Sequence, residues 1–215
     1  MENPLSLAEK TFILHGVDAD LRIDGRRQCE YRSIEIETKL MPQTNGSARL
    51  KIGNTDVLVG KGGDDLATEI SNVLTNTYQS QKTFNLKFLS ILPHKKCWKM
   101  YVDVLILQCG GNLYDAIGAA IKAALFNTEL PRVTAATLDG GEADLQVSDD
   151  PFDCVTLNVE SFPVLVTLCK IGDNCIVDPI AEEEACAAAS VVLSNNHWDL
   201  KDQSLVFYVS KIKSL

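Results

Sequence analysis

The first part of the chain alternates apolar and polar residues with the period of β-strands. Ile34 and Ile36 alternate with glutamates, which predicts a strand with one buried face. Two further strands are expected at 47–52 and 55–59, because Gly53-Asn54 between them is typical of a tight hairpin. The pattern therefore predicts an antiparallel hairpin that is preceded by a third strand.

Helices are predicted at four places. The first lies around 6–12, and the second follows Gly62-Gly63-Asp64-Asp65, whose carboxylates favour the positive end of a helix dipole. The third, 113–126, is rich in alanine and contains Gly118, so its backbone can lie close to a sheet. The fourth starts near Asp178-Pro179, since proline suits the start of a helix. The apolar face expected on the second helix comprises Leu66, Ile70, Val73 and Leu74.

The longest strand pattern in the sequence covers 98–108. Gly110-Gly111-Asn112 breaks it, and Asn112 is expected to cap the following helix. Further on, 154–159 and 163–171 are predicted to form an antiparallel pair. Strand pairs followed by helices indicate an α+β fold, an α/β sandwich. We expect one domain, because no repeat or flexible linker divides the chain.

Composition is that of an ordinary globular protein. The 215 residues are 46% apolar and 23% charged, and no apolar run approaches the roughly 20 residues of a membrane helix. The start of the chain lacks the features of a secretory signal, so secretion is not expected. The seven cysteines are scattered without a C-x-x-C pair, which predicts free structural thiols and a reducing compartment. Several lie in apolar strand patterns, such as Cys169, where a buried free thiol is expected.

The chain is acidic, with a net charge of −9 and a pI near 4.8. Nucleic-acid binders usually carry a basic surplus, because neutralising phosphates supplies most of their affinity. We therefore expect weak RNA binding by the isolated chain. A subunit that lends a few basic residues to a composite channel remains compatible with this charge.

Motifs for chemistry are weak. The Gly62-Gly63 and Gly110-Gly111 turns precede predicted helices and could hold phosphate there, but tight structural turns are the commoner explanation. No cofactor or metal site is predicted, since solvated acids in turns are commonplace and the three histidines lack ligand spacing. The acidic residues considered for Mg²⁺ are Asp139, Glu142, Asp144, Asp149, Asp150 and Asp153.

Several segments together resemble the RNase PH superfamily, and within it the ring subunits of the RNA exosome. Any one segment is weak evidence, but their joint occurrence in this order is highly specific and extends to about Ser194. The segments are DGRR at 24–27, NGSARLKIGNTDVLVG at 45–60, GGDDLATEI at 62–70, the long stretch at 97–133, SDDPFD at 148–153, PVLVTLCKIG at 163–172 and VDPIAEEEAC at 177–186.

The resemblance implies an RNase PH-like fold and a hexameric ring built with other subunits of this kind. Cap subunits would sit above the ring, and RNA would thread through its pore during ribosomal RNA maturation and messenger RNA decay. The implied locations are the nucleus, nucleolus and cytoplasm. The partners implied are therefore ring subunits, cap subunits and RNA, with no membrane.

The resemblance also implies that the catalytic site is degenerate. Active relatives bind inorganic phosphate with a Gly-Gly-Thr/Ser-Arg turn, which here reads Gly110-Gly111-Asn112-Leu113. They also use two aspartates, at positions that here hold Asp178 and Glu184. Losing preorganised phosphate donors should cost orders of magnitude in rate. We therefore expect a non-catalytic subunit.

Two departures from the family pattern shape the domain prediction. A family segment containing sheet strands and a pore-facing loop is absent near 60/61, and the sequence after 194 no longer follows the family. We therefore predict an incomplete RNase PH-like domain at 1–194 and a divergent tail at 195–215. Loss of strands would expose sheet edges, so the isolated chain should be marginally stable.

The DGRR segment supplies the RNA-contact candidates. Asp24, Gly25, Arg26 and Arg27 are expected either to touch RNA or to bridge ring neighbours. Two other functions stay open from the sequence: a phosphorolytic 3′-to-5′ exoribonuclease, and a truncated isoform that does not assemble.

Overall fold

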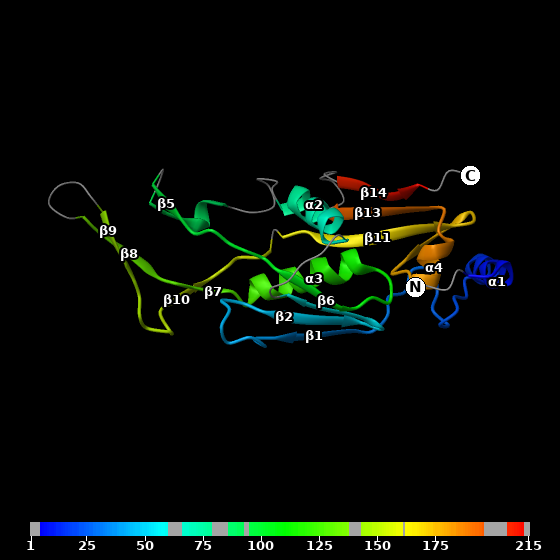
Figure 1. Ribbon diagram of the computed structural model, residues 1–215, viewed down its shortest axis with the longest axis horizontal. Coiled ribbons are helices and arrows are strands. Elements are labelled where there is room, and N and C mark those ends of the chain that lie inside the picture. The colour runs from blue at the N-terminus through cyan, green and yellow to red at the C-terminus, as the bar shows by residue number, and fades with distance from the viewer. Residues whose placement is uncertain are drawn as a thin grey trace.

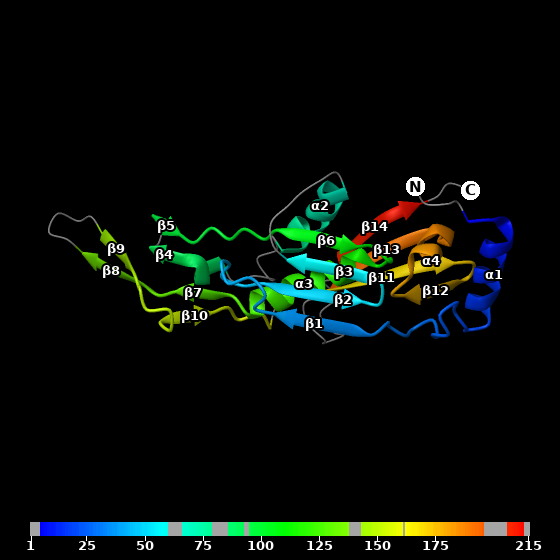
Figure 2. The same ribbon diagram turned by 60° about the horizontal axis from the view of Figure 1, so that its bottom comes forward.

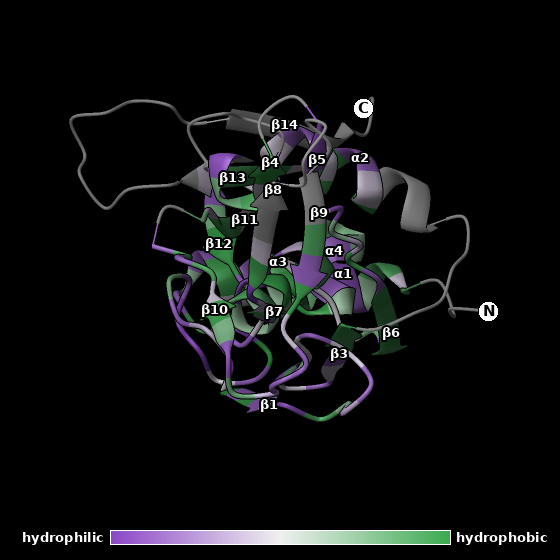
Figure 3. Cartoon of the chain, turned by 90° about the vertical axis from the view of Figure 1, so that its left-hand side faces the viewer, coloured by the Kyte–Doolittle hydropathy of each residue, from purple (hydrophilic) through white to green (hydrophobic). Residues whose placement is uncertain are grey.

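Two antiparallel sheets enclose one central helix, α3 (Leu113–Phe126), in the computed structural model (Figure 1). The structure describes residues 5–59, 66–78, 86–92, 95–137, 143–160, 162–195 and 206–212. Buried side chains of the first sheet and of α3 form the main hydrophobic core. In Figure 3, α3 and the strands β6 and β11 are coloured mainly as hydrophobic.

The strand order is β1-β2-β3-β6 in the first sheet and β12-β11-β13-β14 in the second. The first contains β1 (Ile34–Thr38), β2 (Ala48–Ile52), β3 (Thr55–Val59) and β6 (Val104–Gln108). The second contains β11 (Val164–Ile171), β12 (Asn174–Val177), β13 (Ala189–Asn195) and β14 (Val206–Ile212).

The remaining elements lie around this sandwich (Figures 1 and 2). One end carries α1 (Leu7–Asp18) and α4 (Ala181–Cys186), and α2 (Leu66–Tyr78) lies beside α3. Short pairs of strands extend from the other end. They are β4 (Ser90–Leu92) with β5 (Lys96–Cys97), β7 (Glu129–Pro131) with β10 (Cys154–Thr156), and β8 (Val133–Thr137) with β9 (Ala143–Val147). The 3₁₀ helix η1 (Leu86–Leu89) precedes β4. Within the described residues, every helix is too short or too polar to cross a bilayer.

Two local predictions, a hairpin and a helix, are confirmed. The hairpin around Gly53 pairs Ile52 with Thr55, and the helix expected at 113–126 has those bounds. A Cβ built at Gly118 would lie 3.0 Å from Leu165 Cδ1 on β11, so glycine does allow the close approach of helix and sheet. The mixed α+β class is confirmed as well.

The strand predicted over 98–108 is too long. Only Val104–Gln108 forms β6, and its pairing with β3 ends at Val59 opposite Val104. Residues 98–103 run beyond the end of β3 and so have no described strand beside them. An alternating pattern marks residues that could lie in a sheet, but a partner strand decides how many do.

The predicted pairing of 154–159 with 163–171 is wrong. Cys154–Thr156 pairs with Glu129–Pro131 instead, and β11 pairs with β12 on one side and β13 on the other. The true partner of β10 lies more than twenty residues earlier in the chain. Periodicity predicts strands but does not choose between distant partners.

The buried face predicted for the first strand is wrong, because all five residues of β1 are exposed. Ile34 and Ile36 are 49% and 51% exposed, and among the described strands β1 pairs only with β2, at the edge of the sheet. At the opposite edge, Leu105 and Leu107 of β6 are 38% and 48% exposed. Both edges of the first sheet therefore present apolar side chains to solvent.

The thiol prediction holds in part. All seven cysteines are free, and Cys169 is buried on β11 as expected, where burial raises the pKa of its thiol to about 11. Four of the other free cysteines are exposed. These are Cys29, Cys97, Cys109 and Cys175.

Candidate functional site

Asp178 lies at the centre of the polar network between the two sheets. It follows β12 with a left-handed φ of 45°, and its side chain is fully buried. Arg32 donates to Asp178 Oδ2 from its backbone N (2.8 Å) and Nε (2.9 Å), and to Oδ1 from Nη2 (2.7 Å). Arg26 Nη1 and Asn112 Nδ2 donate as well, at 3.0 and 2.7 Å. Both carboxylate oxygens are therefore engaged within the chain.

These donors determine the ionisation of Asp178. Burial alone would raise its pKa, but the hydrogen bonds from Arg32 and Asn112 and the charge of Arg32 outweigh burial and lower the pKa below its ordinary value. Asp178 is therefore an ionised anchor for two guanidinium groups. Such a carboxylate is poorly suited to accept or deliver a proton during catalysis.

A second ion pair fixes the start of α4. Arg22 and Glu183 are both fully buried, with Arg22 Nε 2.9 Å from Glu183 Oε1 and Nη2 bonded to Oε2. Arg22 Nη2 also donates to the carbonyl of Asp178 at 2.8 Å. Glu183 Oε2 accepts from the backbone N of Ile180, which satisfies one free donor of the short helix. The pair thus joins the loop before β1 to the segment that carries Asp178.

The Gly110-Gly111-Asn112 turn packs tightly against the start of α4. Gly111 has a φ of 90°, and a Cβ there would lie 2.5 Å from the carbonyl oxygen of Pro179. The carbonyls of Gly110 and Gly111 accept from Arg32 at 2.9 and 3.2 Å. Only glycine fits at position 111, since it tolerates both this backbone conformation and this close approach.

Glu184 is bonded where an anion could otherwise approach the turn. The backbone N of Asn112, just before α3, donates to Glu184 Oε1 at 2.8 Å. Helix N-termini attract anions through such backbone donors. Here a carboxylate of the same chain takes the donor, and it would repel a phosphate. The Glu184 carboxylate therefore occupies the position at the turn where a phosphate could otherwise bind.

Asn112 does not cap α3 as predicted. It precedes the helix with a φ of 57°, and its side chain makes no capping hydrogen bond. Instead, Nδ2 bridges Asp178 Oδ1 and Asp115 Oδ2, at 2.7 and 3.0 Å. The Asn112 side chain is therefore part of the buried network and not available at the surface.

Asp115 on α3 extends this network towards the second sheet. Its oxygens accept from Tyr31 Oη at 2.8 Å and from Thr167 Oγ1 at 2.7 Å. Burial raises the pKa of Asp115, although these hydrogen bonds oppose the shift. Burial and the charge of Asp115 also place the pKa of Tyr31 far above its usual range. The Asp115 carboxylate thus joins α3 to the loop that carries Tyr31 and to strand β11, which carries Thr167.

We predict a pH-dependent difference between the wild type and Asp115→Asn. A raised folded-state pKa means that the folded chain binds the proton more tightly than the unfolded chain, so wild-type stability falls as pH rises through that pKa. The variant lacks this ionisation. Its free energy of unfolding relative to wild type should therefore improve from pH 4 to pH 7, as measured by urea unfolding. A relative loss over this range would contradict the assignment.

The residues of the DGRR segment differ in whether their side chains are free to contact another molecule. Arg26 is held by Asp24 at 2.8 Å and by Asp178, and its side chain is only 11% exposed. Arg27 is exposed, and its backbone N donates to Glu30 Oε2. Gly25 adopts a φ of 84° in the turn just before these arginines. Arg27 is thus the member of this segment whose side chain can reach another molecule.

Sequence reasoning missed Arg22, Arg32, Asp115 and Glu183. Each is a charged residue to which neither the pattern nor the resemblance assigned a role, and each has a bonded partner far along the chain. Two of the acidic residues considered for Mg²⁺, Asp139 and Glu142, lie outside the described residues. Two of the three histidines, His94 and His197, lie outside them as well. No group of side chains in the described part of the chain has the composition of a metal site.

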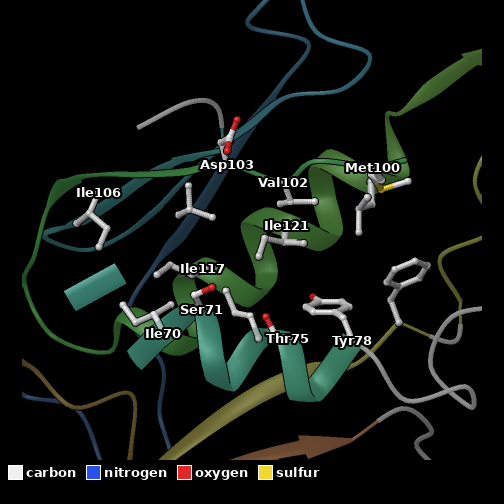
Figure 4. Close-up of a pocket in the computed structure, with 14 residues that line it drawn as sticks. Ile70, Ser71, Thr75, Tyr78, Met100, Val102, Asp103, Ile106, Ile117 and Ile121 are labelled. Atoms are coloured by element: carbon white, nitrogen blue, oxygen red, sulfur yellow. The ribbon is translucent and has the colours of Figure 1, made fainter. Parts of the chain in front are cut away.

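A separate cavity of about 650 Å³ lies between α2, α3 and the segment leading into β6 (Figure 4). Its walls are mainly apolar, with Ile70 and Tyr78 on α2 facing Ile117 and Ile121 on α3. The buried hydroxyl of Tyr78 has no hydrogen-bond partner among the described residues. Asp103 is the one charged side chain among the described residues that line this cavity, so it offers little for acid–base chemistry.

Comparison with known proteins connects this arrangement to a family. Residues 30–61 and 60–131 match domain 1 of the 3′ exoribonuclease family, RNase PH, and residues 161–196 match domain 2. The exosome complex component Rrp42 of Sulfurisphaera tokodaii is 30% identical, over 90% of this chain and 80% of its own length. A Dictyostelium discoideum protein with the provisional name exosome complex exonuclease RRP42 is 29% identical, over 89% of this chain and 84% of its own length.

A solved structure supports the same assignment. A chain of the Archaeoglobus fulgidus exosome, described as having RNA bound to the active site, superposes with a TM-score of 0.73. It is 25% identical and covers 97% of this chain and 89% of its own length. The sandwich around α3 and the sequence similarity agree, and the chain belongs to the RNase PH-type 3′ exoribonuclease family, among its exosome ring components.

Proposed function

We propose that this chain is a non-catalytic ring subunit of an exosome, which supports ring assembly and the passage of RNA in 3′-to-5′ processing and decay. The observation that carries the proposal is the state of the turn at Gly110-Gly111-Asn112. Glu184 bonds its backbone donor, and Arg32 bonds its carbonyls. Inorganic phosphate would have to displace the chain's own side chains to bind there.

The charges around the turn argue against phosphorolysis. An enzyme of this type needs a cation for the phosphate, and Arg26 and Arg32 already pair with Asp178. Leu113 stands where active relatives place an arginine. Asp178 itself is buried and engaged by three side chains. The alternative of a phosphorolytic exoribonuclease is therefore disfavoured.

Exposed apolar edges support a role in assembly. Ile34 and Ile36 lie on one edge strand of the first sheet, and Leu105 and Leu107 lie on the other. Open edges of this kind are normally covered by a neighbouring chain or protected by charge. Ring neighbours and cap subunits are the partners we propose, with the nucleus, nucleolus and cytoplasm as the locations.

Reconstitution tests this proposal. The full chain, co-expressed with an RNase PH-type ring partner, should co-elute with it in size-exclusion chromatography. Binding to the folded state should also raise the melting temperature, since a partner that binds only the folded chain stabilises it by mass action. Separate elution, with a sharp melt of the isolated chain at high temperature, would instead support the alternative of a product that does not assemble.

A further inference from the structure

One stretch of this acidic protein carries only positive charge. Residues 70–102 contain five lysines and neither aspartate nor glutamate, whereas the whole chain has a net charge of −9. The described part of the stretch includes the β4–β5 hairpin, at the end of the molecule away from α1 and α4 (Figure 2). Positive charge is therefore concentrated in one segment of the chain.

The lysines of this hairpin and of the segment just after it are available to bind another molecule. Lys95, Lys96 and Lys99 are exposed, and none forms an ion pair with another described residue. In contrast, Arg26 and Arg32 are engaged in internal pairs. These lysines thus resemble a binding surface more than a structural network.

Aromatic side chains accompany the charges. Tyr101 is 73% exposed, and Lys99 Nζ lies 4.8 Å from the centre of its ring. Phe88 on η1 is 41% exposed. Exposed aromatic rings between cations are the means by which proteins hold single-stranded nucleic acid, with stacking on bases and attraction of phosphates.

A hollow lies directly beside these residues. Its volume is about 600 Å³, and it is lined by Trp98, Lys99 and Tyr101 together with the amide side chains of Gln43 and Asn45. Aromatic faces and amides are groups that bind unpaired bases. Asp103 also lines the hollow and is the acidic group among its described lining residues. A flat acidic protein surface would use the lysines but would leave the aromatic residues and the amides without a role.

We propose that the surface formed by Lys95, Lys96, Lys99 and Tyr101 binds single-stranded RNA. This inference rests on the proposed function, because a ring subunit handles RNA, but it places the binding surface apart from the degenerate turn. Binding is electrostatic at the lysines and involves base stacking at Tyr101. The surface reconciles an acidic chain with RNA binding, since the basic residues act locally.

The test uses a labelled oligouridine with the full chain, both isolated and in complex with its ring partner. Ultraviolet cross-linking and mass spectrometry should place nucleotide adducts within 95–101. Tyr101→Ala should weaken binding by about 5- to 100-fold. Lys96→Ala/Lys99→Ala should reduce the slope of log affinity against log salt by about 1.4, or about 0.7 for each phosphate that the variant no longer neutralises.

The matched control is Lys10→Ala/Lys170→Ala, which removes two exposed lysines elsewhere and should leave RNA affinity unchanged. Equal effects of the two double variants, or adducts only outside 95–101, would overturn the inference. Loss of a neighbouring subunit with unchanged RNA affinity would identify a protein interface and overturn it too. Failure of the wild type to assemble counts against the proposed function alone, because the isolated chain still reports adducts.

Discussion

Asp178→Ala is expected to lower the free energy of unfolding by about 3–5 kcal/mol, because it leaves buried guanidinium groups without their counterion. The Arg26 and Arg32 side chains are only 11% and 9% exposed, so water cannot readily replace the carboxylate. The loop before β1 and the Gly110-Gly111 turn would lose their common anchor. Urea unfolding followed by circular dichroism measures the change.

Two further variants make the Asp178 prediction specific. Asp149→Ala removes an exposed carboxylate and should change stability by no more than about 0.5 kcal/mol. Asp178→Asn keeps the size and one acceptor, so its loss should lie between those of the two alanine variants. A loss below about 1 kcal/mol for Asp178→Ala would mean that the carboxylate does not hold this network together.

Gly111→Ala is expected to cost about 2–6 kcal/mol, the sum of a steric and a backbone penalty. The added methyl group would meet Pro179 O at 2.5 Å and Ala181 N at 2.6 Å, and both are backbone atoms that cannot rotate away. Overpacking of this kind costs about 1–3 kcal/mol, and a left-handed non-glycine residue costs about 1–3 kcal/mol as well. Relief of the clash would move α4 away from the turn and break the bond between Asn112 and Glu184.

Gly25→Ala is the matched control for backbone conformation. Gly25 also has a positive φ, 84°, but nothing lies within 4 Å of a Cβ built there. Its substitution should therefore show the backbone cost alone, about 1–3 kcal/mol. The melting temperature of Gly111→Ala should therefore be lower than that of Gly25→Ala, because only the substitution at Gly111 also clashes with Pro179. Equal losses would show that the turn and α4 are not packed as tightly as described.

Much of the fold could be predicted because it depends on near neighbours. The hairpin at Gly53-Asn54 and helix α3 follow from turn residues and periodicity within short windows. The length of β6 and the partner of β10 could not be predicted in this way. Both depend on where β3 ends and where β7 lies, which are tertiary facts.

Only part of the candidate site could be predicted from the sequence. Resemblance to the family singled out Gly110, Gly111, Asn112, Asp178 and Glu184, and the structure brings these residues together around one turn. Arg32 is 146 positions from Asp178, and Arg22 is 161 positions from Glu183. No local pattern marks such pairs. The filling of the turn by the chain's own side chains is therefore visible only in three dimensions.

The measurement that tests the central claim most directly is phosphate-dependent RNA degradation. The purified full chain would be incubated with single-stranded RNA with and without inorganic phosphate, and released nucleoside diphosphates would be quantified. We predict no release above the phosphate-free control, because Glu184 and Arg32 occupy the turn. Phosphate-dependent release of nucleoside diphosphates that disappears in Asp178→Asn would contradict the account.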